Sequence, residues 1–76
     1  METNLHTMNN LFAQLGLPAT APAIDEFIAA HRPLPNDIAL YRAPFWSSAQ
    51  REFLKEEIID DADWAPVIDE LNVRLR

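Results

Sequence analysis

Cysteine is absent from this sequence of 76 residues, and glycine occurs only once. The lack of cysteine excludes a disulfide framework and thiol chemistry. A chain of this length buries only about 60–65% of its unfolded surface, which is enough for a single domain with little margin. Without disulfides, its stability must come from dense helix packing or from oligomerisation.

Long apolar runs are also missing. No run approaches the roughly 20 residues that a transmembrane helix needs. Residues 1–6 contain neither the basic region nor the apolar block of a signal peptide. We therefore expect a soluble, cytoplasmic protein that does not enter a membrane.

Basic residues are few. Six Lys and Arg residues stand against twelve Asp and Glu residues, so the formal charge is −6. A negative field repels both the phosphates of nucleic acids and anionic lipid headgroups. The sequence therefore argues against direct nucleic-acid binding and against membrane binding.

Apolar residues, by contrast, are plentiful, and their spacing is that of helices. They make up 49% of the chain, too much for a disordered protein. From Leu5 onwards they recur at i, i+3, i+4 and i+7, and no segment alternates for long enough to form a strand. The pattern predicts one all-α domain over residues 1–76, with four short helices at about 8–15, 21–31, 48–60 and 64–75.

Polar residues mark the ends of the predicted helices. Thr7 and Thr20 precede the first two helices as N-caps, and Ser47 with Gln50 fits a capping box at the start of the third. Gly16 follows the last apolar residue of the first helix, where a left-handed residue is expected. The helix boundaries are therefore predicted from local chemistry.

Residues 32–46 form the connector between the second and third helices. The connector holds three prolines and no glycine, and it is too apolar for a flexible linker. We expect it to be ordered, with one helical turn at about 37–41. Phe45 and Trp46 at its end are predicted to fill the centre of the domain, since each ring has about 150–250 Å² to bury. The full predicted core is Leu11, Phe12, Leu15, Ile24, Phe27, Ile28, Phe45, Trp46, Phe53, Trp64, Ile68 and Leu71.

The third predicted helix carries apolar residues over an arc wider than one stripe. At the α-helical spacing, Leu54, Ile58 and Ile59 do not share a single face. The helix is either wedged between neighbours or leaves an apolar edge for a partner. We expect Ile59, or Leu54 with Ile58, to contribute to a weak homodimer.

Four segments of the sequence resemble a family of small uncharacterised bacterial proteins, one of the families built on a domain of unknown function. The segments are 10–17 (NLFAQLGL), 27–34 (FIAAHRPL), 43–46 (APFW) and 61–65 (DADWA). The resemblance extends over nearly the whole chain. It implies a compact helical protein and supplies no activity, cofactor or catalytic residue.

Residues that could carry chemistry are scarce. His6 and His31 are the only side chains suited to general base catalysis near neutral pH, and they lie far apart in the sequence. We interpret His31 as a core-edge residue that is satisfied by a carbonyl or carboxylate, and His6 as a solvated residue. Ser47 is explained by capping and lacks a positioned base. We therefore expect no enzymatic activity, no metal and no cofactor.

Acidic residues cluster late in the chain. Residues 52–70 hold eight Asp and Glu residues and one basic residue, Lys55. Asp61 or Asp63 is predicted to cap the fourth helix, but a calcium loop from Asp61 fails, because Pro66 falls where glycine is required. The acidic run is either a solvated face or a surface for a basic partner, such as a site that normally binds nucleic acid.

The leading interpretation of function is a non-enzymatic protein-interaction module with an acidic face. Its principal contacts are predicted to be Glu56, Glu57, Asp60 and Asp61. The alternative is a small-molecule-binding or catalytic protein with a pocket near His31, Tyr41 and Trp46. A cluster of those three side chains around a cavity of some 300 Å³ would favour the alternative, and filled space there would favour the interaction module.

Overall fold

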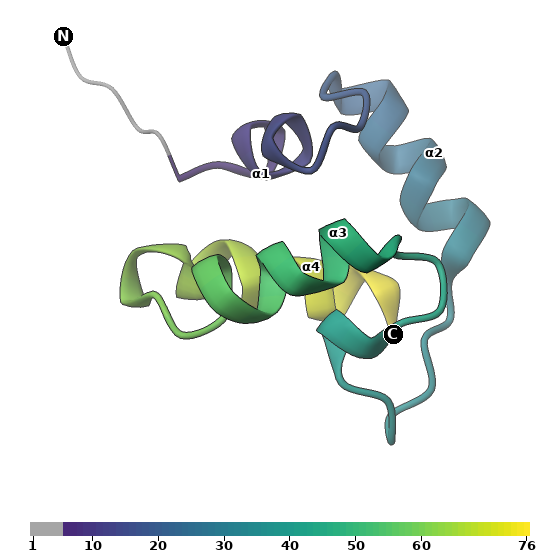
Figure 1. Ribbon diagram of the computed structural model, residues 1–76. Coiled ribbons are helices and arrows are strands. Elements are labelled where there is room, and N and C mark those ends of the chain that lie inside the picture. The colour runs from purple at the N-terminus through teal and green to yellow at the C-terminus, as the bar shows by residue number, and fades with distance from the viewer. Residues whose placement is uncertain (1–5) are drawn as a thin grey trace, which may run out of the picture.

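The computed structural model describes residues 6–76 and contains, over this range, four α-helices joined by short turns (Figure 1). The α-helices are α1 (Met8–Gln14), α2 (Ala21–His31), α3 (Ser48–Phe53) and α4 (Ala65–Leu75). The remaining helical turns are η1 (Leu40–Arg42) and η3 (Ala62–Trp64), both of the 3-10 type, and η2 (Leu54–Ile58), which is a π-helical turn. The prediction of an all-α fold is confirmed. Leu5, with which the predicted apolar pattern begins, lies outside the described residues.

The predicted caps form. The Thr7 and Thr20 hydroxyls accept hydrogen bonds from backbone N–H groups in the first turns of α1 and α2. Ser47 and Gln50 make both bonds of the capping box, at 3.1 Å and 2.8 Å. The Gln50 amide also donates to the Leu15 carbonyl at 2.9 Å, so the start of α3 is tied to the end of α1.

Gly16 ends α1 in the left-handed region, with φ at 77°. The Leu17 N–H donates to the Phe12 carbonyl and the Gly16 N–H to the Ala13 carbonyl, which is the Schellman pattern. The only glycine of the sequence therefore stands where the backbone requires one.

The connector is ordered and lies against the end of α4 (Figure 1). The Leu34 N–H donates to the Leu75 carbonyl at 2.7 Å. The Arg76 guanidinium donates to the carbonyls of Pro35 and Ile38. The helical turn predicted at 37–41 forms slightly later, as η1. These hydrogen bonds attach the end of α4 to the connector in the middle of the sequence.

An aromatic cluster joins α2 to the end of the connector. Phe27 is its central ring, with ring centroids of Phe12, Phe45 and Trp46 at 5.3, 5.5 and 5.6 Å. Trp46 is buried, and its indole N–H donates to the Leu40 carbonyl at 2.8 Å. Phe45 is only partly buried. The prediction of a central position is therefore confirmed for Trp46 and wrong for Phe45, which packs at the rim of the cluster.

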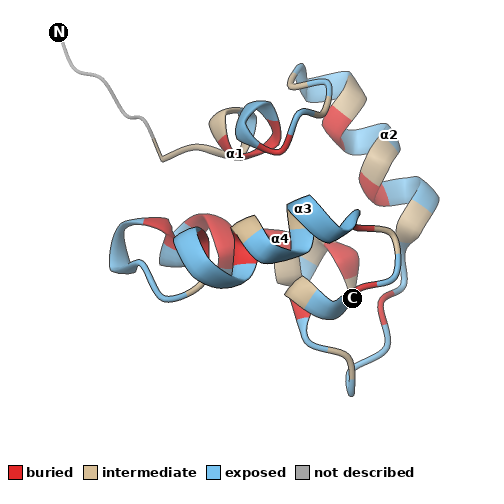
Figure 2. Ribbon diagram, viewed as in Figure 1, coloured by how far each residue is buried: buried red, intermediate tan, exposed pale blue. Residues whose placement is uncertain are grey.

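Most of the predicted core is buried, and one continuous cluster of buried side chains includes residues from every helix but α3. The exceptions among the predicted residues are Phe27, Phe45 and Phe53, which are partly exposed and pack against the cluster. Along α2, buried and exposed residues follow one another as bands of different colour, as expected for an amphipathic helix (Figure 2). Several connector and α4 residues complete the core: Leu34, Leu40, Ala43, Val67 and Leu75.

The helix predicted at 48–60 is continuous but changes type at Leu54. There the π turn η2 begins, and the Ile59 N–H donates to the Leu54 carbonyl at 2.9 Å, five residues back instead of four. Leu54 and Ile58 are four positions apart and lie on the same side, and both are buried, with 0% and 1% of their surface exposed. The expected dimer contact through Leu54 with Ile58 is therefore wrong. Ile59 is partly exposed, and a homodimer through it stays a prediction.

Within residues 6–76, no helix has both the length and the apolar character needed to cross a bilayer.

Candidate functional site

The acidic face, defined as Glu56, Glu57, Asp60 and Asp61, is exposed at all four positions. The ion pairs of the described residues join Arg74 to Asp25 and to Glu70. None of the four residues of the acidic face takes part in them. Their charges therefore face solvent without a basic side chain of the described chain to neutralise them.

The structure divides the acidic face into two parts. Glu56 and Glu57 line a shallow hollow of about 290 Å³ on α3 and η2, together with Ala49, Glu52 and Phe53. We call this the Phe53 hollow. Asp60 and Asp61 follow η2 and are not among its lining residues. The Asp61 carboxylate instead accepts from the Asp63 N–H at 2.9 Å and caps η3. The predicted cap of the fourth helix by Asp61 or Asp63 is therefore wrong for α4, whose N-cap residue is Trp64 and which has no side-chain cap.

Ala49 and Phe53 give the Phe53 hollow an apolar floor. The two residues are four positions apart, so they lie on one side of α3. They also line a neighbouring hollow of about 170 Å³ with Gln14, Leu15 and Gln50. Phe53 was predicted to be a core residue, but part of its side chain is exposed. The i, i+4 spacing of Ala49 and Phe53 beside three glutamates is the sequence feature that indicates this apolar surface.

The alternative site does not form one cavity in the described structure. His31 packs against Phe27 and Phe45, with ring centroids at 4.3 and 4.5 Å. Trp46 belongs to the same aromatic cluster, whereas Tyr41 lines a hollow to which His31 and Trp46 do not contribute. The structure thus brings two of the three predicted residues together, by packing, and places the third elsewhere.

Both histidines make packing contacts. His31 Nδ1 lies 2.7 Å from the Phe27 carbonyl oxygen, and since a carbonyl only accepts, this nitrogen carries the proton and donates. The interpretation of His31 as a core-edge residue satisfied by a carbonyl is confirmed. The interpretation of His6 as simply solvated is wrong, because its ring lies edge-on to Trp64 with centroids 4.8 Å apart.

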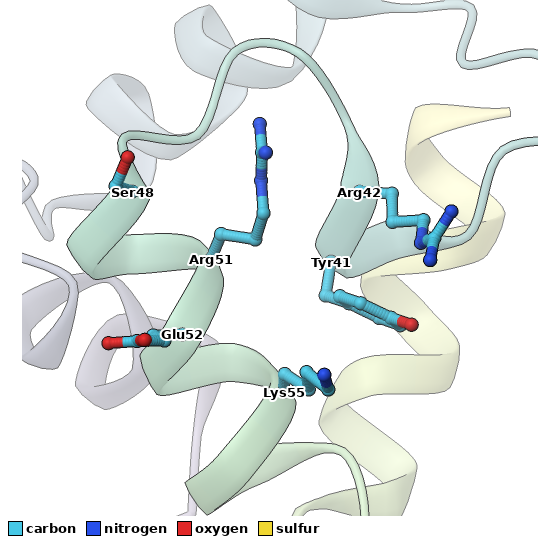
Figure 3. Close-up of a pocket in the computed structure, with 6 residues that line it drawn as sticks. All are labelled: Tyr41, Arg42, Ser48, Arg51, Glu52 and Lys55. Atoms are coloured by element: carbon cyan, nitrogen blue, oxygen red, sulfur yellow. The ribbon is translucent and has the colours of Figure 1, made fainter.

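A third hollow was not expected from the sequence. It has a volume of about 530 Å³ and is lined by Tyr41, Arg42, Ser48, Arg51, Glu52 and Lys55 (Figure 3). We call it the basic hollow. Its residues come from η1, α3 and η2, so it depends on how the connector folds against the helix. No sequence spacing relates Tyr41 and Arg42 to Arg51, so the site is not predictable from the sequence pattern.

No group of three or more His, Asp or Glu side chains that could hold a metal ion occurs between residues 6 and 76.

Comparison with known proteins identifies a family but no specific function. No curated protein and no solved structure matches the chain. The family described as "Protein of unknown function (DUF2789)" matches residues 1–75, so the resemblance drawn from the four sequence segments is confirmed. The match covers nearly the whole chain, and the protein therefore belongs to this family of unknown function.

Proposed function

We propose that this chain is a cytoplasmic, non-enzymatic interaction module that binds a basic protein partner through its acidic face and the adjoining Phe53 hollow. The observation that carries the proposal is the apolar floor of that hollow. A merely solvated acidic surface needs no exposed aromatic ring among its glutamates. Here Phe53 is partly exposed between Glu52, Glu56 and Glu57.

The chemistry of the Phe53 hollow favours one kind of ligand. An apolar side chain can cover Phe53 and Ala49, and flanking Lys or Arg side chains can pair with the surrounding glutamates. We therefore infer a partner segment in which an apolar residue lies between basic ones. Asp60 and Asp61 extend the negative surface beyond the hollow, which suits a partner longer than one turn of helix.

The charge of the whole chain supports the same partner class. A formal charge of −6 accelerates encounter with cationic surfaces, and salt weakens this attraction. The non-enzymatic part of the proposal is supported by His31, whose ring is held between Phe27 and Phe45 and bonded to a backbone carbonyl. A residue fixed in this way serves packing.

The test is quantitative capture of partners from cells that contain the protein, using three variants of equal charge. One variant is Glu56→Gln with Glu57→Gln, and the second is Asp60→Asn with Asp61→Asn, which retains an acceptor for the η3 cap. The matched control is Glu26→Gln with Asp37→Asn, two exposed acids elsewhere. Each pair changes the formal charge from −6 to −4, since two negative charges are removed.

We expect the Glu56/Glu57 variant to reduce capture by about fivefold or more, because each exposed ion pair contributes up to about 1 kcal/mol. The Asp60/Asp61 variant should reduce it less, and the control hardly at all. At about 0.5 M salt the Debye length is about 4 Å, so attraction between exposed charges is largely screened. If capture survives this salt concentration and both variants of the acidic face, the acidic face serves only to keep the protein soluble.

A further inference from the structure

Three of the six basic residues of this acidic chain line one hollow. Arg42 comes from η1, Arg51 from α3 and Lys55 from η2. Glu52 is the only acid among the lining residues. Arg51 and Lys55 are four positions apart on the helix formed by α3 and η2, and like charges at this spacing repel one another unless an anion compensates them.

The fold itself does not supply that anion. In the described part of the chain, the side chains of Arg42, Arg51 and Lys55 make no ion pair, although twelve acidic residues are present in the sequence. In Figure 3 the Glu52 carboxylate points away from η1 and the hollow. By contrast, Arg74 pairs with Asp25 and Glu70, and Arg76 is bonded to backbone carbonyls. The basic side chains of the hollow thus remain available to an external ligand.

Donors reach the hollow from two segments that are distant in sequence. Figure 3 shows the Arg51 side chain extending into the gap between α3 and η1, with Lys55 one turn further along, pointing towards Tyr41. The Arg42 guanidinium lies 5.8 Å from the centroid of the Tyr41 ring and leaves η1 on the side away from α3. Arg42 is exposed and is one of the lining residues of the hollow.

We propose that the basic hollow binds the phosphate group of a small phosphorylated molecule. Arg51 would supply a two-pronged contact to the phosphate oxygens, because the guanidinium fork matches phosphate geometry. Lys55 would add a point charge. The volume of about 530 Å³ exceeds that of a phosphate ion and lies in the range of small-molecule sites, which leaves room for the rest of the ligand beside the Tyr41 ring.

A small ligand fits this surface better than a nucleic acid or a membrane does. Glu52, Glu56 and Glu57 occupy neighbouring positions of the same helix and are exposed. An extended polyanion that reached Arg51 would meet these glutamates and the overall charge of −6. A single phosphate group beside Arg51 and Lys55 meets fewer of these negative charges than an extended polyanion does.

The experiment is a titration of the isotope-labelled full chain with inorganic phosphate, followed by NMR, with acetate at equal ionic strength as the comparison anion. We expect phosphate to shift the signals of Tyr41, Arg42, Arg51 and Lys55 in a saturable manner, and acetate to do so much more weakly. Arg51→Gln should weaken phosphate binding by about tenfold, the loss expected for one charged hydrogen-bonded contact.

The matched control is Arg32→Gln, which removes the same charge from an exposed arginine in a different hollow. It should leave phosphate affinity within about twofold, as a distant surface charge does at moderate salt. Equal effects of the two substitutions, equal shifts with acetate, or an unchanged affinity in Arg51→Gln would each overturn the proposal. A short single-stranded oligonucleotide that binds more tightly than phosphate, at equal phosphate concentration, would replace the small ligand with a nucleic acid. The spectra also report folding, so loss of structure is not mistaken for loss of binding.

Discussion

Trp46 is the residue that fixes the connector to the helices. It is buried, it stacks on Phe27 of α2, and its indole N–H reaches back to the Leu40 carbonyl. One side chain thus fills the core and satisfies a backbone acceptor within the connector. Phe45 stands next to it in sequence but covers the rim of the same cluster.

Truncation of Trp46 should therefore be far more damaging than truncation of Phe45. We expect Trp46→Ala to lower the free energy of unfolding by about 3–5 kcal/mol, as for large aromatic residues in cores. Phe45→Ala should lower it by clearly less, because part of that ring is already in water. Urea denaturation followed by circular dichroism measures both; a Trp46→Ala protein that melts within a few degrees of the parent would contradict the role of Trp46.

Gly16 gives a second test at the scale of one residue. An added Cβ meets no atom within 4 Å, so the substitution Gly16→Ala introduces no clash. Because φ at this position is 77°, the substitution should nevertheless lower the free energy of unfolding by about 1–2 kcal/mol. Gly16→Asn should be milder, because asparagine tolerates this region better. Thermal denaturation that ranks alanine as equal to glycine would show that the left-handed conformation is not required.

Sequence reasoning works well where an effect is local. The capping box at Ser47, the N-caps Thr7 and Thr20, and Gly16 depend on neighbours within a few positions, and they were predicted correctly. The different burial of Phe45 and Trp46 was not predictable in this way. Both are large aromatics in adjacent positions, and both lie against Phe27. They differ in their other partners, which are the Leu40 carbonyl for Trp46 and the His31 ring for Phe45.

At the scale of elements, the sequence pattern did not predict the π turn η2. At the α-helical spacing Ile59 lies on a different face from Leu54 and Ile58, and the apparent surplus of apolar faces suggested a dimer. In the structure Leu54 and Ile58 face the core, while the π turn bonds the Ile59 N–H to the Leu54 carbonyl and leaves Ile59 partly exposed. The turn also lies between the basic hollow and the Phe53 hollow, in keeping with the frequent occurrence of π turns at functional sites.

Removal of the extra residue should therefore be tolerated. Deletion of Glu57, which is exposed within η2, places Ile59 four residues after Leu54 and permits ordinary α-helical bonding. We expect the free energy of unfolding to change by about 1 kcal/mol or less, as for most changes at the surface.

Deletion of Glu52 is the matched control, since it removes the same charge from α3. This deletion either rotates the capped start of α3 away from Leu15 or moves Lys55 into the buried position of Leu54. We therefore expect the free energy of unfolding to fall by about 2–5 kcal/mol. Chemical denaturation of the two deletion variants separates these outcomes. Equal destabilisation by both would mean that the π turn is not a removable insertion.

At the scale of the whole molecule, charge is distributed unevenly around the helix formed by α3 and η2. Glu52, Glu56 and Glu57 surround Phe53, while Arg51 and Lys55 line the hollow next to η1. The sequence predicted the excess of acid and its location in the chain. It did not predict the basic hollow, because that site exists only once the connector has folded back against α3.

The central claim is that the Phe53 hollow is a docking surface for a basic segment with an apolar residue. The most direct measurement is an NMR titration of the labelled chain with a pentapeptide that has one leucine between two pairs of lysines, in about 50 mM salt, where surface charges are weakly screened. A second peptide with serine in place of leucine tests the apolar contact. We predict that the leucine peptide shifts mainly Ala49, Glu52, Phe53, Glu56 and Glu57, and that the serine peptide and the Glu56→Gln/Glu57→Gln variant weaken the effect. Equal shifts at remote acids such as Glu26, Asp37 and Asp69, with no difference between the two peptides, would contradict the claim.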